Sequence, residues 1–194
     1  MAEPALDGAA AARRHFAERG KSVITFLGYS GSGYEDESAM LARAAVVLEE
    51  ADPRTALVNI GATPDGIGAV YALAKRLGFE TTGIVSSQAR ANGVVMSPFV
   101  DAVFEIEDTS WGGFVKGTTR LSPTSQLMVD VSDRLVAIGG GDVARDELLV
   151  AQQRGKPTRF IAADMNHAAA RARAAKAGLP EPTDFSGPAA AALR

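Results

Sequence analysis

The residues best placed to do chemistry are Gly139, Gly140 and Gly141, followed by Asp142 and later by Glu147. They stand where an apolar segment passes into a helical pattern. Glycines at such a junction bring backbone close to a ligand, and unpaired N–H groups at a helix start attract anions. The pattern therefore predicts a binding site. A plain turn in which Asp142 only caps the helix is the alternative.

A second glycine-rich stretch follows the first apolar segment and contains Gly28, Ser30, Gly31 and Ser32. Its glycines do not have the Gly-x-Gly-x-x-Gly spacing of dinucleotide-binding loops. The carboxylates at 35–37 favour the start of a helix but repel phosphate. We therefore expect this loop to contact a ribose or a base through its hydroxyls and N–H groups, unless it is only a flexible turn.

Two further loops could contribute to the same site. The loop at 61–69 contains three glycines that allow close packing or the approach of an uncharged ligand, and Asp65 is expected to cap the helix after it. Trp111, the only tryptophan, precedes Gly112 and Gly113. It could stack on a base or form part of a lid, but the favoured interpretation is a core residue that anchors its loop.

Composition excludes several classes of site and partner. The chain has 194 residues, 46% of them hydrophobic, and a formal net charge of -3, which is typical of an ordinary globular domain. The 20 basic residues form no long run, so we expect no nucleic-acid partner. There is no cysteine, and His15 and His167 both lie in terminal segments, so we expect neither a metal nor a cofactor.

The N-terminal segment lacks the basic start and apolar run of a signal peptide, and no apolar stretch reaches membrane-spanning length. These features predict a cytoplasmic protein that does not bind membranes. The chain is expected to divide into an N-terminal helical extension at 1–20, a central domain at 21–165, and a C-terminal helix with a flexible tail at 166–194.

Short apolar segments alternate with helical patterns along most of the chain. Such alternation predicts an α/β fold with a doubly wound parallel sheet of about six to seven strands, with helices on both faces. Ligands in these folds bind at the carboxyl ends of the strands where the winding direction reverses, typically between the first and fourth strands. The strands are expected at 23–27, 56–60, 81–85, 102–106, 134–138 and 158–162.

The order of these motifs resembles the LOG family of phosphoribohydrolases, long labelled possible lysine decarboxylases, within the Rossmann-like nucleotide binders. The resemblance covers about Lys21 to Ala163. It consists of the glycine-serine loop at 28–33, the glycine-rich loop and helix start at 61–70, the segment Thr82-Gly83-Ile84-Val85, and the family's Pro-Gly-Gly-x-Gly-Thr-x-x-Glu signature on 139–147.

The signature is incomplete in this chain. Gly140, Gly141 and Glu147 match it, but Gly139 replaces its proline and Val143-Ala144 replaces its Gly-Thr pair. The family's catalytic arginine belongs to an Arg-Lys pair where this chain has Thr124 and Ser125. Arg120, one turn upstream, is the candidate substitute.

The resemblance implies a nucleotide-binding protein, for a ligand like a nucleoside monophosphate, in which the catalytic motif is degenerate. Arg120, Thr124 and Ser125 are expected to add polar contacts to those of the glycine loops. The first alternative is an active phosphoribohydrolase that cleaves an N-glycosidic bond, with Glu147 as the catalytic carboxylate and Arg120 or Arg145 replacing the missing arginine. The second is a structural module without a ligand. The resemblance also implies a homo-oligomer, a dimer or an assembly of dimers.

Overall fold

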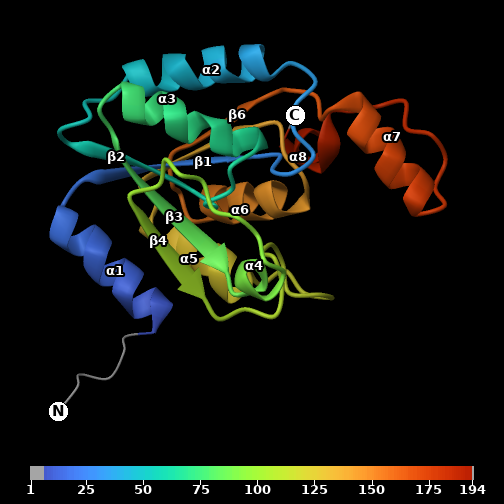
Figure 1. The fold of residues 1–194 in the computed structure, drawn as a ribbon. Coiled ribbons are helices and arrows are strands. Elements are labelled where there is room, and N and C mark those ends of the chain that lie inside the picture. Colours follow the sequence, from blue (N-terminus) through green and yellow to red (C-terminus); the bar gives the residue numbers. More distant parts are fainter. Residues whose placement is uncertain (1–6, 194) are drawn as a thin grey trace.

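Six strands form one parallel sheet in the order β4-β3-β2-β1-β5-β6 (Figure 1). The computed structural model describes residues 7–193, so the first residues of the helix expected before Gly8 lie outside the description. Each predicted strand is confirmed to within one residue at either end. The strands are β1 (Ser22–Gly28), β2 (Ala56–Ile60), β3 (Glu80–Ser86), β4 (Ala102–Ile106), β5 (Arg134–Ile138) and β6 (Thr158–Ile161).

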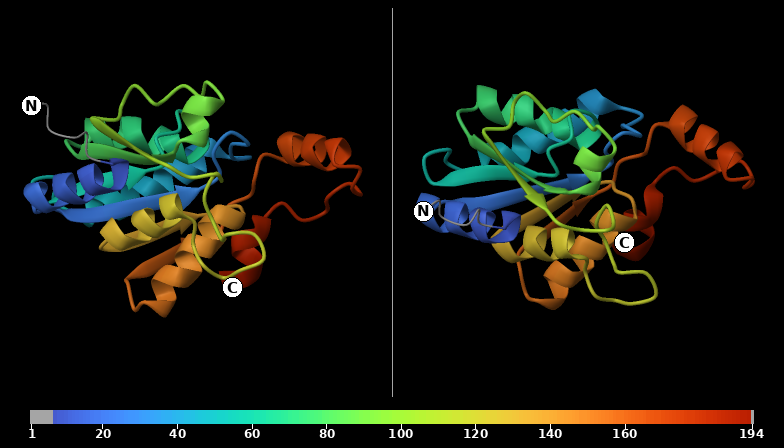
Figure 2. Two further views of the ribbon diagram at one scale, coloured as in Figure 1. Left: turned by 90° about the horizontal axis from the view of Figure 1, so that it is seen from below. Right: turned by 60° about the horizontal axis from the view of Figure 1, so that its bottom comes forward.

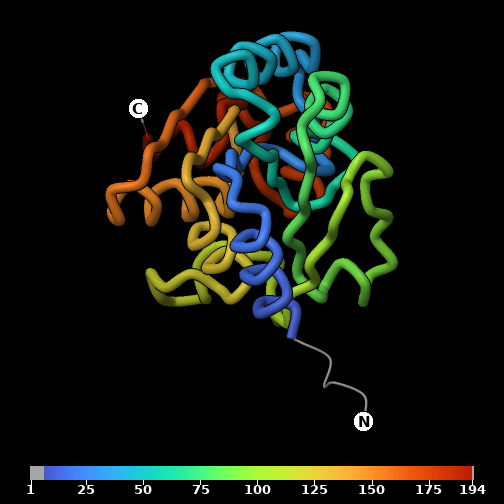
Figure 3. Tube along the Cα trace, turned by 90° about the vertical axis from the view of Figure 1, so that its left-hand side faces the viewer, coloured from blue at the N-terminus to red at the C-terminus, as the bar shows by residue number. Residues whose placement is uncertain are grey.

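Helices cover both faces of the sheet, as the alternating pattern predicts. The helices of the described chain are α1 (Gly8–Arg19), α2 (Glu37–Glu49), α3 (Val70–Arg76), α4 (Gln88–Ala91), α5 (Pro123–Val131), α6 (Asp142–Gln153), α7 (His167–Lys176) and α8 (Gly187–Leu193), with a short 3-10 helix, η1 (Gly66–Ala69). Apolar side chains of α2 and α3 pack on one face of the sheet, and those of α1, α5 and α6 pack on the other. Figure 3 looks onto α1, with α2 near the top of the view.

The winding direction reverses between β1 and β5. Strand β1 pairs with β2 on one side and with β5 on the other, in register from Ile24 against Arg134 to Gly28 against Ile138. The reversal was expected between the first and fourth strands, but β4 continues outward beyond β3 and forms an edge of the sheet. Helix α1 covers that edge, where Phe16 packs 5.9 Å from the ring of Phe104.

The C-terminal segment differs from the flexible tail that the sequence predicts. Helix α7 buries none of its residues and projects from the body (Figure 2). The chain then returns and forms α8, in which Ala189 and Ala190 are fully buried. The Ala189 N–H donates to the Gly140 carbonyl at 3.1 Å. These alanines are therefore small enough to pack closely against the loop after β5.

Candidate functional site

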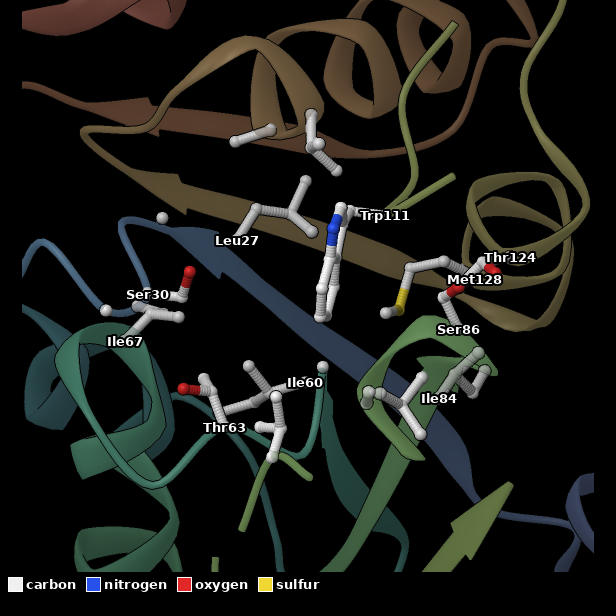
Figure 4. Close-up of a pocket in the computed structure, with 18 of the residues that line it drawn as sticks. Leu27, Ser30, Ile60, Thr63, Ile67, Ile84, Ser86, Trp111, Thr124 and Met128 are labelled. Atoms are coloured by element: carbon white, nitrogen blue, oxygen red, sulfur yellow. The ribbon is translucent and has the colours of Figure 1, made fainter. Parts of the chain in front are cut away.

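A pocket of about 580 Å³ opens at the carboxyl ends of β1, β2 and β3 (Figure 4). The sheet contributes the ends of these strands, including Leu27, Ile60 and Ile84, and the helices on one face contribute Met128 of α5 and Ala144 of α6. The carboxyl edge is where an α/β fold is expected to bind a ligand, and the volume is within the range of small-molecule sites. The observed pocket therefore lies at the predicted edge of the sheet.

The structure brings together only some of the predicted site residues. Five of them line the pocket: Gly28, Ser30, Gly31, Thr124 and Glu147. Ser32 and Ser125 do not line it. The Ser125 hydroxyl donates to Glu147 of the pocket wall, whereas the Ser32 hydroxyl accepts from Arg173 of α7. Arg120 lies on an exposed loop and is also absent from the pocket wall. The remaining predicted residues, Gly139, Gly140, Gly141 and Asp142, are outside the wall as well.

The glycine loop after β5 is needed for packing. Gly139 has φ 57°, and a β-carbon there would lie 2.6 Å from the Tyr29 ring and 2.7 Å from the Ala163 carbonyl oxygen. Gly140 has φ 135°, and its β-carbon would lie 2.6 Å from that of Ala144. These two glycines let the loop pass under Tyr29 and the C-terminal segment. Packing alone therefore accounts for the glycines at these two positions, without a bound ligand.

The charged residues at the start of α6 are paired with one another. The N-cap of this helix is Gly141, so Asp142 does not cap it as the alternative interpretation supposed. Asp142 instead accepts from Arg145 at 2.6 Å. The same guanidinium donates to Asp146 Oδ1 at 2.7 Å, and Asp146 Oδ2 accepts the Phe114 N–H at 2.8 Å. Arg145 is therefore engaged by two carboxylates and does not line the pocket.

Glu147 is a buried carboxyl group in the pocket wall, 3% exposed. The Ser125 hydroxyl accepts the Gly113 N–H at 2.7 Å and donates to Glu147 Oε1 at 2.6 Å. Burial raises the pKa of Glu147 to about 8, the bond from Ser125 lowers it, and the charge on Asp146 raises it further. Glu147 is therefore mostly protonated near neutral pH and can both donate and accept a hydrogen bond.

Thr124 is positioned by Asp108, which the sequence analysis did not identify. Its N–H donates to Asp108 Oδ2 at 3.0 Å, and the Ser110 N–H donates to Oδ1 at 2.9 Å. Burial raises the pKa of Asp108, but these N–H groups outweigh burial and hold it below its ordinary value. The carboxylate therefore ties the loop after β4 to the first turn of α5.

Trp111 is not the core residue that the sequence favoured. Its side chain is 55% exposed and lines the pocket, and Figure 4 shows its indole ring between Leu27 and Met128 in this view. Val94, Val95 and Met96, from the segment between α4 and β4, also line the pocket. The exposure of Val95 is 74%. The apolar run directly after Gly93 is the sequence signal that identifies these residues.

Two tyrosines shape the loop after β1. The Tyr34 hydroxyl accepts the Tyr29 N–H at 3.2 Å and donates to the Ile138 carbonyl at 2.7 Å. The Tyr29 hydroxyl donates to the Ser186 carbonyl at 2.8 Å. Position 28 requires glycine because a β-carbon there would collide with the Tyr34 hydroxyl. The loop is therefore tied to β5 and to the segment before α8, and it is not a free turn.

No lysine, arginine or histidine among residues 7–193 lines the pocket. Its ionisable residues are Asp65 and Glu147, and Asp65 is the N-cap residue of η1 without a capping bond from its side chain. Within residues 7–193, no group of three or more His, Asp or Glu side chains is arranged to hold a metal ion. None of the helices described there is long and apolar enough to cross a membrane.

Comparison with known proteins identifies the fold. No protein-family model and no curated protein matches the sequence. Among solved structures, the protein TM1055 matches with a TM-score of 0.51 at 20% identity, over 71% of this chain and 72% of its own. The molybdenum cofactor carrier protein of Chlamydomonas reinhardtii and the molybdenum cofactor binding protein of Rippkaea orientalis each match with a TM-score of 0.52 at 18% identity, over 72% of this chain and 76% of theirs. The chain therefore has a Rossmann-like fold.

Proposed function

We propose that this protein is a divergent LOG-like protein that binds a nucleoside or nucleotide and does not hydrolyse it. The observation that carries the proposal is a pocket wall that combines apolar side chains with one buried, neutral acid, Glu147. A protonated carboxyl group pairs well with the amide or amidine edge of a nucleobase, because each partner offers one donor and one acceptor. The exposed indole of Trp111 offers a surface on which a base can stack.

The fold neighbours support binding of a small molecule in general. Two of them are named for the molybdenum cofactor that they carry or bind. These neighbours therefore support the proposal that a protein of this fold binds a ligand. The class of ligand is argued from the residues of the present pocket. The wall offers the hydroxyl group of Ser30, which suits ribose or ring substituents.

Hydrolysis is the second candidate because Glu147, which matches the last residue of the family signature, does line the pocket. Cleavage of an N-glycosidic bond needs negative charge beside the oxocarbenium-like sugar. Glu147 is largely neutral near pH 7, and Asp146 is held by Arg145 and by the Phe114 N–H. The arrangement therefore favours binding over catalysis.

The test is titration of the protein with nucleosides and their 5′-monophosphates, followed by calorimetry and by chromatographic detection of free base. We expect binding without release of base. Glu147→Gln keeps a neutral donor and acceptor, so it should retain binding within about threefold, whereas Glu147→Ala should weaken it by about tenfold or more. Release of base that disappears in Glu147→Gln would establish the hydrolase instead. No binding by any member of the set would favour a structural module.

A further inference from the structure

The loop after β1 presents donors that have no acceptor in the described protein. Of its backbone N–H groups, that of Tyr29 donates to Tyr34 and that of Gly33 donates to the Ser30 carbonyl. Within residues 7–193, the N–H groups of Ser30, Gly31 and Ser32 donate to no protein acceptor. Ser30 and Gly31 line the pocket, so this turn lies at its rim. Consecutive free N–H groups in a glycine-rich turn are suited to an anion.

Arg173 of α7 reaches the same turn. Its guanidinium Nη2 donates to the Ser32 hydroxyl oxygen. In the part of the chain that the structure describes, Arg173 has no carboxylate partner. Arg171 on the same helix is paired with Glu181 at 2.8 Å. Arg173 therefore brings to the rim a positive charge that no acidic side chain of the described protein neutralises.

Helix α7, which bears Arg173, is fixed at its N-terminal end. The Asn166 N–H donates to the Gly33 carbonyl at 3.2 Å, and the His167 N–H donates to Glu35 Oε2 at 2.7 Å. His167 also stacks on Phe185 with the ring centroids 3.9 Å apart. These contacts fix the start of α7 beside the loop after β1. The position of Arg173 thus follows from the fold of the C-terminal segment.

Two of the acidic residues after this loop are bonded to backbone N–H groups, and both keep their negative charge. Glu35 is engaged by the His167 N–H, and Asp36 accepts the Ala39 N–H at 2.8 Å as the cap of α2. The carboxylate that remains in the pocket wall is Asp65, in the loop after β2. It can accept hydrogen bonds from ribose hydroxyls, which lie between the base and the 5′ group of a nucleotide.

We propose that Ser30, Gly31, Ser32 and Arg173 form a subsite for the anionic group of the ligand, so that the protein prefers a nucleoside 5′-monophosphate to the nucleoside. This inference rests on the proposed function and specifies its ligand. The anion lies at the loop after β1, and the packed glycines after β5 take no part. Arg173 of α7 supplies the positive charge that the described pocket wall lacks.

The experiment compares the affinities of adenosine and guanosine with those of AMP and GMP by calorimetry, for the wild type and two variants. Arg173→Ala removes the proposed contact, and its exposed position on a helix without buried residues leaves the fold intact. Arg76→Ala is the matched control for net charge, because Arg76 is exposed at the end of α3, away from the carboxyl edge of the sheet. We expect the monophosphates to bind the wild type about tenfold more tightly than the nucleosides.

The same preference should survive in Arg76→Ala and disappear in Arg173→Ala, with nucleoside affinity unchanged. Equal affinities for nucleoside and monophosphate in the wild type would overturn the inference and leave the proposed function in place. A preference that persists in Arg173→Ala would also overturn it. If no nucleoside or nucleotide binds, the proposed function fails and the inference fails with it.

Discussion

At the scale of single residues, Glu147 couples the pocket to the stability of the fold. Its side chain is buried beside Asp146, and the hydroxyl of Ser125 donates to it. The folded protein favours the protonated form of Glu147. Between the ordinary pKa and the higher pKa of the folded protein, a rise in pH therefore lowers the free energy of unfolding. The same preference makes Glu147 a hydrogen-bond donor for a ligand near neutral pH.

Replacing Glu147 by Gln should flatten the dependence of stability on pH. The pKa of Glu147 in the folded protein, about 8, lies above its ordinary value of 4.5. The contribution of the protonated carboxyl group to the free energy of unfolding is therefore complete below about pH 4.5 and is lost as the pH rises to about 8. Over that range the wild type should lose stability at up to about 1.4 kcal/mol per pH unit relative to Glu147→Gln. Urea unfolding at pH 5 to 9 measures it. Glu49→Gln, at an exposed site on α2, should follow the wild type.

Gly139 should be far less tolerant of substitution than Gly141. In Gly139→Ala the positive φ and the nearby Tyr29 ring both oppose a β-carbon, which should lower the free energy of unfolding by about 2 kcal/mol or more. Gly141→Ala meets no atom within 4 Å and has φ -83°, so it should cost under about 1 kcal/mol. Chemical denaturation compares the two. Similar costs at both positions would contradict the packing role of the loop.

At the scale of elements, α8 is part of the fold and lies against the loop after β5. A charge at Ala190, which is fully buried, should lower the free energy of unfolding by about 3 kcal/mol or more, because it has no partner there. Ala191 is the adjacent exposed position and provides the control. Thermal unfolding of Ala190→Asp and Ala191→Asp should therefore give a large decrease in Tm only for the first. An equally small effect in both would show that α8 does not stabilise the protein.

The elements differ in how well their sequences predict them. Strands such as β2 and β5 are largely apolar segments between turn signals, so their bounds were predicted to the residue. The Ser122-Pro123 start of α5 is also a local signal, because proline fits the first turn of a helix. The position of β4 in the sheet was not predicted, since its short sequence is compatible with pairing to β1 or to β3. Pairing depends on the path of the crossover connection, which local sequence does not specify.

At the scale of the whole molecule, the pocket joins segments from β1 to α6, so an occupied pocket links distant parts of the chain. At a concentration of 100 times Kd a ligand adds about 2.7 kcal/mol of stability. For a chain of this size, that gain corresponds to a rise in Tm of about 5 to 10 °C. Differential scanning fluorimetry with the best-binding nucleotide measures the shift.

Trp111→Ala provides the matching control for that shift. The side chain is largely exposed, so the Tm of the free protein should change little, while the rise caused by the ligand should fall to less than half. The wild type offers a second readout, because its only tryptophan lies in the pocket wall and its fluorescence should change on binding. An unchanged shift in Trp111→Ala would show that the indole does not contact the ligand.

The sequence by itself determined the fold class, the strands and the edge at which a pocket opens, because hydrophobic periodicity and glycine placement are local properties. The tertiary structure decided which residues face that pocket. It buried Gly139 and Gly140 under Tyr29 and α8, exposed Trp111 in the pocket wall, and brought Arg173 to Ser32 across 141 positions of the chain. Contacts between residues so far apart depend on how whole elements pack, and no local pattern encodes them.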